Sequence, residues 1–313
     1  MFSRKLTEQG FSCASLASHV SLAARIVTLH IFEMTDTMLT VTRELTDDDR
    51  GALGRAVDAL EKTTLAGRLT NLLGRQIALA GQAIPERVRD AAAKGANVAM
   101  RAAMSGALRS LRGDRKAASS KLHMAAIAAS GAAGGALGLA ALPFELPAST
   151  ILMLRAIADV ARAEGEDMAD PQVALACLEV FALGGRTEAD DHLDSSYFAV
   201  RALLARSMSQ ASRYIIDKGL VDEAAPVLVK LLSKIAARFG VVLSQKFAAQ
   251  ALPIIGAMGG AAVNLAFLQH FEQIAKGHFA VRRLERIYGP DLVRSEYERL
   301  AAAIASAAQT APG

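Results

Sequence analysis

The chain has 313 residues and a net charge of +4, with 52% hydrophobic and 21% charged residues and a mean hydropathy of +0.27. This length allows one or two domains with a sizeable core. Its two cysteines, Cys13 and Cys177, exclude a disulfide framework and have no metal-binding spacing. The sequence lacks a GxxxxGK[ST] loop, an HExxH motif and a GxSxG turn. We therefore expect neither a cofactor nor a metal.

The N-terminal region carries no clear targeting signal, because it lacks a compact hydrophobic segment followed by a cleavage site. We expect residues 1–45 to be a poorly ordered extension, or the product of a mis-assigned start, with Met34 or Met38 as the alternative. Thr46 and Asp49 then form a capping-box-like pair that predicts the start of a helix. We expect one helical domain over residues 46–302 and a frayed tail over 303–313.

The first half of this domain is strongly basic. Residues 50–121 hold fourteen Lys and Arg against five Asp and Glu, and the spacing of their apolar residues predicts amphipathic helices on both sides of Pro85. Two interpretations remain open: the solvated face of a helical bundle, and a surface that binds anionic lipid headgroups. Nucleic acid is not an expected partner, because the region has no aromatic residue on which a base can stack.

Two long stretches without charged residues follow, Leu122–Phe144 and Phe247–Phe271. The first is long enough to cross a bilayer, but its many Ala and Gly residues bring the free energy of insertion close to zero. Both contain GxxxG spacing, which favours close helix packing, at Gly131, Gly134, Gly135, Gly138, Gly256 and Gly260. We expect them to pack together as hairpin elements, the first turning at Pro143–Pro147 with Glu145 at its tip.

Local signals divide the rest of the chain into further helices. Asp170 and Pro171 predict a helix start, and Gly184–Gly185 predict its end through a left-handed cap. We expect Gly240 to interrupt the helix that begins at Pro226. We also expect a turn at Lys276–Phe279 and a last helix that begins at Pro290–Asp291.

Several polar residues are candidates for function. Arg155 and Asp159 are spaced as a helical i,i+4 pair. The acids of Glu188–Asp194 are the densest group of possible metal ligands, which we interpret as charges that precede the positive end of a helix. Asn264 and His270 interrupt the second uncharged stretch, either as satisfied core residues or as a ligand site.

Three stretches carry a family resemblance: LPFELPASTILMLRAIADVARAEGED, CLEVFALGGR and GAMGGAAVNLAFLQHFEQIAKGHFAVRRLERIYG. They resemble the proteobacterial branch of the EcsC family, named after a protein encoded beside an ABC transporter, over residues 50–300. The resemblance implies no catalytic residue, because no activity is established for the family. It marks, as motif positions, Glu145, Arg155, Arg186, Asp190, Asp191, Asn264, His270, His278 and Arg283.

These observations predict an all-α helical bundle. As function we expect a non-enzymatic, membrane-associated protein, cytoplasmic and peripheral or partly inserted at the inner membrane, accessory to an ABC exporter or to envelope maintenance. Its expected partner is a membrane surface or a membrane protein. One alternative is a soluble hydrolase-like enzyme with a buried polar site around Glu145, Asn264 and His270. The other is a soluble protein-interaction module.

Overall fold

The computed structural model describes residues 44–62, 65, 85–110, 142–185, 196–218, 225–250 and 256–310. The chain divides into two units, Met1–Leu45 and Thr46–Gly313, and the helices below belong to the second unit. Within the described residues there is no strand, which confirms the predicted all-α class. The predicted packing of two Gly/Ala-rich hairpins falls largely outside the described residues and stays a prediction.

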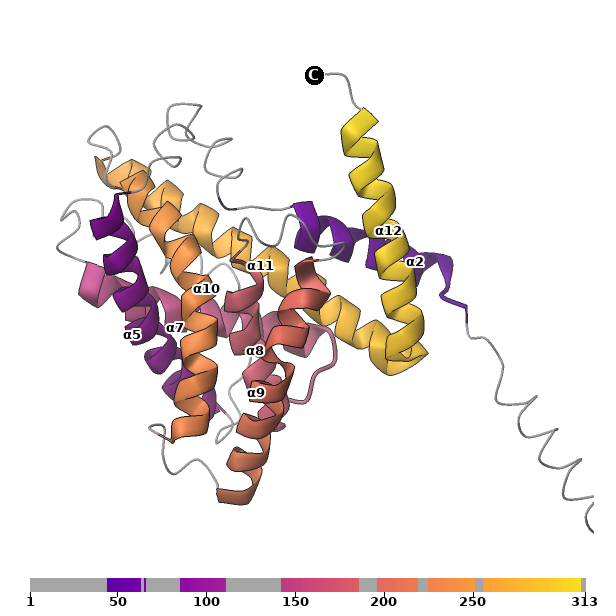
Figure 1. Ribbon diagram of the computed structural model, residues 1–313, viewed down its shortest axis with the longest axis horizontal. Helices are drawn as coiled ribbons and strands as arrows, with labels where there is room; N and C mark the ends of the chain where they lie inside the picture. The colour runs from indigo at the N-terminus through magenta and orange to yellow at the C-terminus, as the bar shows by residue number, and fades with distance from the viewer. Residues whose placement is uncertain are drawn as a thin grey trace, which may run out of the picture. The chain divides into compact units, whose positions relative to one another are not determined.

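The helices and their bounds, in chain order, are α2 (Asp47–Val57), the π-helical segment η1 (Asp58–Lys62), α5 (Glu86–Ser110), α7 (Leu142–Ala163), α8 (Pro171–Leu183), α9 (Ser196–Lys218), α10 (Pro226–Gln250), α11 (Gly256–Tyr288) and α12 (Pro290–Thr310). Helices α5 and α10 lie side by side, and the long helix α11 runs from them toward α2 and α12 (Figure 1). Helix α9 lies against α8 and α10.

Helix α8 forms the centre of the core. Every residue from Val173 to Leu183 is buried, and α5, α7, α9, α10 and α11 all pack against it. A helix that is hydrophobic on every side has to be surrounded in this way. Phe181 anchors the packing, because its ring lies 5.1 Å from that of Phe239 on α10 and 5.2 Å from that of Phe271 on α11.

The predicted helix starts are confirmed by their caps. The Thr46 hydroxyl accepts a hydrogen bond from the Asp49 backbone N–H at 3.2 Å. The Asp170 carboxylate accepts one from the Gln172 backbone N–H at 2.8 Å, with Pro171 at the first helical position. Each bond satisfies an N–H group that has no partner inside the helix.

The predicted turn at Pro143–Pro147 is wrong, because α7 begins at Leu142 and includes both prolines. Pro143 lies in the first turn, where a backbone N–H has no intrahelical acceptor in any case. Pro147 removes only the bond to the carbonyl of residue 143, so the helix tolerates it near its start. Glu145 is thus within the first turns of α7 and not at a hairpin tip.

Two glycines expected to break helices lie inside them. Helix α10 continues through Gly240, and α11 continues through Gly277. A Cβ on Gly240 would lie 3.6 Å from the Cα of Ala93 on α5, and a Cβ on Gly277 would lie 3.2 Å from the carbonyl oxygen of Ala56 on α2. Gly277 therefore lets the backbones of α11 and α2 approach closely, whereas a Cβ at Gly240 would make only an ordinary van der Waals contact with α5.

The end of α8 also differs from the prediction. Gly184 has φ −70°, so no left-handed cap is present there. A Cβ on Gly184 would lie 2.5 Å from Phe271, and a Cβ on Gly185 would clash with the carbonyl of Arg238. Close packing, and not backbone conformation, is what requires glycine at this position. In the described chain only Gly165 and Gly289 have positive φ, and Gly289 ends α11.

None of the helices described here is both long and apolar enough to span a membrane. Most of the first uncharged stretch, residues 122–141, lies outside the described part of the chain.

Candidate functional site

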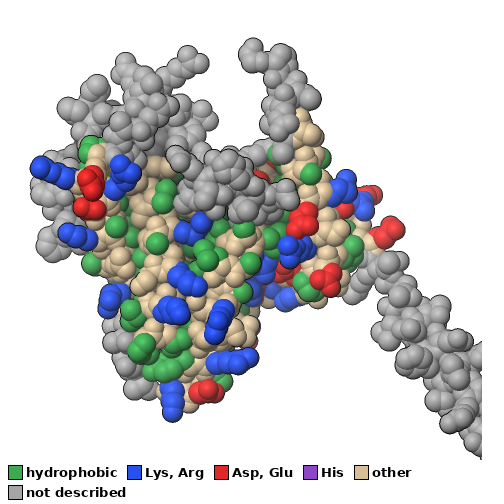
Figure 2. Space-filling view, viewed as in Figure 1, with side chains coloured by type: hydrophobic (Ala, Val, Ile, Leu, Met, Phe, Trp, Pro, Cys, Tyr) green, Lys and Arg blue, Asp and Glu red, His purple; other side chains and the backbone are tan. Residues whose placement is uncertain are grey.

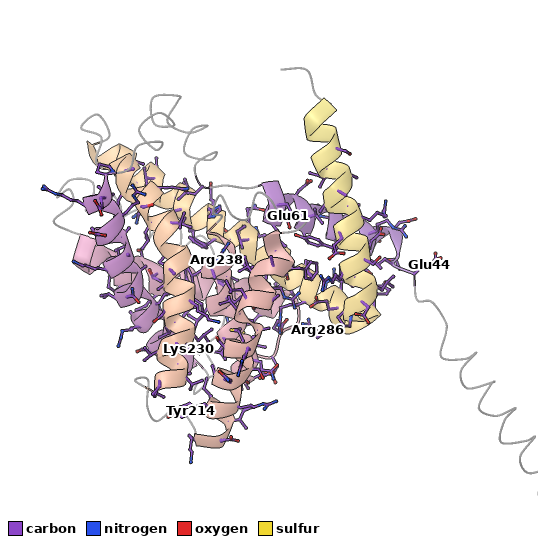
Figure 3. All side chains as sticks on the ribbon, in the orientation of Figure 1. Glu44, Glu61, Tyr214, Lys230, Arg238 and Arg286 are labelled. Atoms are coloured by element: carbon purple, nitrogen blue, oxygen red, sulfur yellow. The ribbon has the colours of Figure 1, made fainter. Side chains whose placement is uncertain are left out.

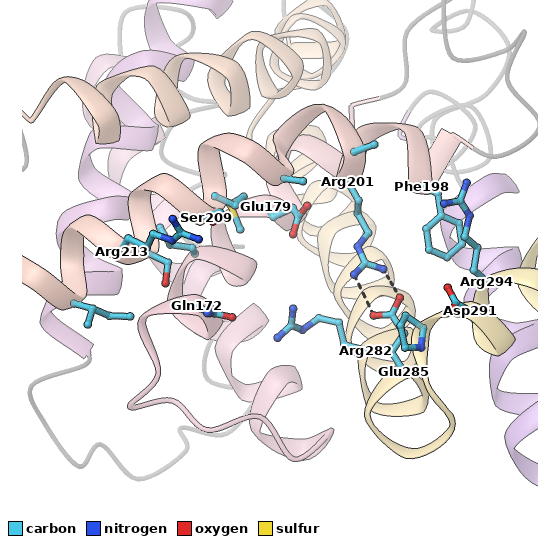
Figure 4. Close-up of a pocket in the computed structure, with 17 residues that line it drawn as sticks. Gln172, Glu179, Phe198, Arg201, Ser209, Arg213, Arg282, Glu285, Asp291 and Arg294 are labelled. Carbon is cyan, nitrogen blue, oxygen red and sulfur yellow. Dashed lines mark hydrogen bonds and ion pairs between the residues drawn. The ribbon is translucent and has the colours of Figure 1, made fainter. Parts of the chain in front are cut away.

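A groove with a volume of about 650 Å³ lies between α8, α9, α11 and the start of α12 (Figure 4). This volume is in the range of small-molecule sites. Its charged lining residues are Arg201, Arg213, Arg282, Arg294, Glu179, Glu285 and Asp291. Apolar side chains from α8 and α9 complete the walls, so the groove offers both charged and apolar surface.

Glu179 is the buried acid of this groove. It extends from the core helix α8, and the residue is only 6% exposed. It makes no hydrogen bond to a described residue, and the Nε2 atom of His278 lies 3.9 Å from its Oε2 atom. Burial raises the pKa of Glu179 to about 7, although the positive charges of Arg201 and Arg282 act to lower this pKa. The carboxyl group therefore exchanges its proton near neutral pH.

A chain of polar contacts leads from Glu179 to the groove wall. The Nδ1 atom of His278 lies 3.1 Å from the Tyr197 hydroxyl. That hydroxyl accepts a hydrogen bond from Arg201, whose guanidinium also binds both carboxylate oxygens of Glu285, at 2.6 and 3.0 Å. Figure 4 shows this Arg201–Glu285 pair facing the opening.

The positions of the protons in this series of hydrogen bonds follow from the fact that Arg201 can only be a donor. Arginine can only donate, so the Tyr197 hydroxyl accepts from Arg201 and is free to donate its own proton to Nδ1 of His278. The proton of the imidazole is then on Nε2, which faces Glu179. Burial and the charges of Arg201 and Arg282 hold the pKa of His278 well below its usual value, so the ring is neutral.

The site exchanges protons but contains no activated nucleophile among its described residues. Burial raises the pKa of the Cys177 thiol to about 12, and it also raises the pKa of Tyr197. Both groups stay protonated at neutral pH, and a thiol or a phenol is a good nucleophile only after it has lost its proton. The described residues also hold no group of three or more potential metal ligands.

A second polar cluster borders the groove and shares Arg282 with it. The carboxylate of Glu166 accepts hydrogen bonds from Arg282 at 2.8 and 3.1 Å and from Arg286 at 2.5 Å. Arg283 binds Glu164 at 3.0 Å and Asp49 at 3.1 Å. Burial alone would raise the pKa of Glu166, but the bonds and charges of the two arginines outweigh it and lower this pKa. The cluster fixes the loop after α7 to the last turns of α11.

The structure brings few of the predicted site residues together. His278 lies in the groove's polar chain, and Arg283 lies in the adjoining cluster. His270 is instead bound to the backbone, with Nε2 3.0 Å from the Gly184 carbonyl oxygen, and Asn264 is fully buried elsewhere on α11. Asp159 pairs with Arg162 and not with Arg155, so the predicted i,i+4 pair is wrong.

Other predicted positions are not tested. Arg186, Asp190, Asp191, Gly131, Gly134, Gly135 and Gly138 lie outside the described residues. Gly256 and Gly260 lie in the first turns of α11, and Arg155 is exposed on α7. The acid cluster Glu188–Asp194 is also outside the described part.

Sequence reasoning missed Glu179, Tyr197, Arg201 and Glu285. One signal was present for Glu179, since it is the only charged residue in the thirteen-residue segment PQVALACLEVFAL. A charged residue inside a fully apolar helix is costly and indicates a partner or a function. Arg201 and Glu285 are 84 residues apart, and no local pattern connects them.

Contacts in the groove and around it connect the three sequence stretches that carry the family resemblance. Glu164 and Glu166 come from the first, Glu179 and Gly184 from the second, and His270, His278 and Arg282 from the third. The fold and the site thus define an all-α protein built around one buried core helix with a polar groove at its side.

The model of the EcsC protein family matches residues 23–284, and the chain belongs to this family. The match begins upstream of residue 50, where the motif resemblance was expected to start. No curated protein and no solved structure matches the chain.

Proposed function

We propose that this protein is a non-enzymatic helical accessory protein that docks peripherally on an anionic membrane surface. The observation that carries the proposal is a basic face on α5, α9 and α10. Figure 2 shows Lys and Arg side chains distributed over these three helices, whereas the region of α2, α11 and α12 mixes both signs. Figure 3 labels one of the basic residues, Lys230, on α10.

The basic face consists of Arg87, Arg89, Lys94, Arg101, Arg206, Arg213, Lys218, Lys230 and Lys234. The exposed acids on the same helices are only Glu86, Asp90 and Asp217, so the excess of positive charge is large. Near an anionic leaflet each Lys or Arg contributes about 1 kcal/mol. A face of this charge is therefore sufficient for reversible binding without a spanning helix.

Three large apolar side chains on the same helices support shallow contact with lipid. Val98 on α5 is 54% exposed, and Leu203 and Ile216 on α9 are 54% and 63% exposed. Exposed apolar residues between basic ones are typical of surfaces that rest in the headgroup region.

The enzyme alternative has no supporting contact. Asn264 and His270 are six residues apart on α11, which separates them by about 9 Å along the helix axis and by about 120° around it. They do not face one small ligand. Assignment to the proteobacterial branch, location at the inner membrane and a role beside an ABC exporter or in envelope maintenance are predictions of the family resemblance.

Vesicle sedimentation with the wild-type protein tests the proposal. We expect the protein to pellet with vesicles that contain phosphatidylglycerol and not with pure phosphatidylcholine vesicles. Binding should be lost at about 1 M salt, where the Debye length is about 3 Å. Equal binding to both vesicle types, or no binding at low salt, would contradict peripheral electrostatic docking.

A further inference from the structure

Two buried polar groups of the groove make no hydrogen bond to a described residue. Glu179 and Ser212 both line it, and the residues are 6% and 4% exposed. The Ser212 hydroxyl oxygen has no hydrogen-bond partner, and Glu179 has no hydrogen bond to a described residue. Buried polar groups are nearly always hydrogen-bonded, so two unpartnered groups in one groove indicate a missing ligand.

Guanidinium groups with unused donors face the same opening. Arg282 binds Glu166 through Nε and Nη2, which leaves its Nη1 group without a bond in the described structure. Arg213 on α9 makes no ion pair or hydrogen bond with a described residue and is exposed. Figure 4 shows Arg213, Ser209, Glu179 and Arg282 around one opening.

The groove also has apolar walls. Leu175 from α8 and Phe198, Met208 and Ile216 from α9 line the groove beside these donors. A ligand that fills about 650 Å³ therefore needs both an anionic group and an apolar part.

We propose that this groove binds a small molecule of net negative charge in which a phosphate group is joined to an apolar moiety. Arginine donors suit phosphate oxygens, and the hydroxyl groups of Ser209 and Ser212 add further donors. An ammonium ligand fits less well, because Glu285 is already paired with Arg201, so that only Glu179 and Asp291 remain among the lining carboxylates, beside the free donors of Arg213 and Arg282. Arg213 and Ile216 belong both to this groove and to the outer face proposed for membrane docking, whereas Glu179, Ser212 and Arg282 belong to the groove alone, so the two proposals can be tested separately.

Protonation of Glu179 should strengthen the binding of the phosphate ligand. The charged or titratable groups that act on it are His278, Arg282 and Glu285 from α11 and Arg201 from α9. A bound phosphate adds negative charge beside the carboxyl group and favours its protonated form. Binding of a ligand of fixed charge therefore tightens as the pH falls from 8 to 6.

Calorimetric titration at pH 7 with three probes tests the proposal. The probes are dihexanoylphosphatidylglycerol below its micellar concentration, inorganic phosphate, and dihexanoylphosphatidylcholine. Binding of the phosphatidylglycerol with weaker binding of inorganic phosphate identifies a lipid-like ligand. Equal binding of both would show that the apolar part contributes nothing to the affinity and would overturn the proposal. Failure of both to bind overturns the proposal, as does phosphatidylcholine binding as tightly as phosphatidylglycerol.

Two matched variants locate the site. Arg213→Glu changes an unpaired, exposed groove residue and should weaken binding of the phosphate probe at least about tenfold. Arg206→Glu makes the same change on the same helix outside the groove and should leave the affinity within about twofold. Equal effects of the two changes would show that only net charge matters and would overturn the groove assignment.

A pH series with phosphatidylglycerol tests the coupling. Wild-type affinity should rise as pH falls, whereas Glu179→Gln, which keeps the shape without a titrating proton, should bind with little dependence on pH. The same pH dependence in both proteins would overturn the role of Glu179. Vesicle binding of Glu179→Gln should stay unchanged, which separates failure of this site from failure of membrane docking.

Discussion

The Nε2 atom of His278 lies 3.9 Å from the Oε2 atom of Glu179, and both side chains are buried between α8 and α11. The two groups do not form an ion pair, because burial disfavours the charged form of each: it lowers the pKa of His278 and raises the pKa of Glu179. The core helix thus holds an acid that changes charge near neutral pH.

The first prediction concerns stability against pH. The pKa of Glu179 is about 7 in the folded protein and 4.5 at its ordinary value, so the folded state binds more protons between these values and stability falls as pH rises through them. Glu179→Gln removes this loss and should be more stable than wild type at pH 8, by up to about 3 kcal/mol, and nearly equal at pH 4.5. Urea unfolding at both pH values measures the difference.

Glu272→Gln is the control for that experiment, because Glu272 is a partly exposed acid on α11 that pairs with Lys276 at 3.0 Å. Its stability should follow wild type at both pH values. A Glu179→Gln protein that shows the wild-type pH slope would contradict the raised pKa.

The second prediction concerns the cluster that holds the loop after α7. Glu166 is only 4% exposed in its side chain and binds both Arg282 and Arg286. Glu166→Gln should lower the free energy of unfolding by about 2 kcal/mol at pH 7, because it leaves two guanidinium groups without their anion. Because the pKa of Glu166 is lowered, this stabilisation is complete above pH 4.5 and disappears as the pH falls further.

Glu298→Gln provides the comparison for Glu166, since it breaks an exposed pair with Arg294 at 2.8 Å. Exposed pairs contribute only about 0 to 1 kcal/mol. Chemical denaturation of the two variants should separate them clearly, and equal losses would mean that the buried cluster contributes no more than a surface pair.

The third prediction concerns the glycines at the end of α8. Gly185→Ala places a methyl group against the carbonyl of Arg238 on α10, and the backbone there has to move. We expect a loss of about 1 to 3 kcal/mol. Gly54→Ala on α2 is the matched change in open space, and it should stabilise the protein by about 0.5 to 1 kcal/mol through helix propensity. Thermal unfolding measures the Tm of each variant. If the Tm of both variants shifts in the same direction from that of wild type, this account of close packing is contradicted.

The fourth prediction concerns the proton on His278. With Tyr197 donating to Nδ1, the ¹⁵N chemical shifts of His278 should show a bare Nδ1 and a protonated Nε2 from pH 6 to pH 8. Tyr197→Phe removes the donor and leaves Arg201 bound to Glu285, so the tautomer should become mixed while the groove's ion pair is kept. A protonated Nδ1 in the wild-type protein would overturn the assigned direction of the Tyr197 hydrogen bond.

Local sequence signals predicted much of the fold. Thr46, Asp170 and the prolines at 171, 226 and 290 mark helix starts, because caps act within one turn and need no tertiary partner. The predictions of helix breaks at Gly240 and Gly277 were wrong, because the role of these glycines depends on tertiary contacts. Both glycines lower the local helix propensity, but the helices that contain them pack against α5 and α2 and continue through them. A local sequence pattern does not contain these tertiary contacts.

The candidate site was predicted only in part for the same physical reason. His278 stood out as a polar residue in a marked motif, but its partners Glu179 and Tyr197 are 99 and 81 residues away in the chain. Helical periodicity tells which side of a helix is buried, and it does not tell which residue of another helix that side meets. The groove therefore depends on helix packing that only the structure provides.

The most direct test of the central claim compares two charge-matched variants in sedimentation with phosphatidylglycerol vesicles. One carries Arg89→Gln, Lys94→Gln and Lys230→Gln on the basic face, and the other carries Arg55→Gln, Lys276→Gln and Arg299→Gln on α2, α11 and α12. Peripheral docking through α5, α9 and α10 predicts that the first variant binds about a hundredfold more weakly than wild type and the second binds nearly as wild type. Equal binding of the two variants would contradict it.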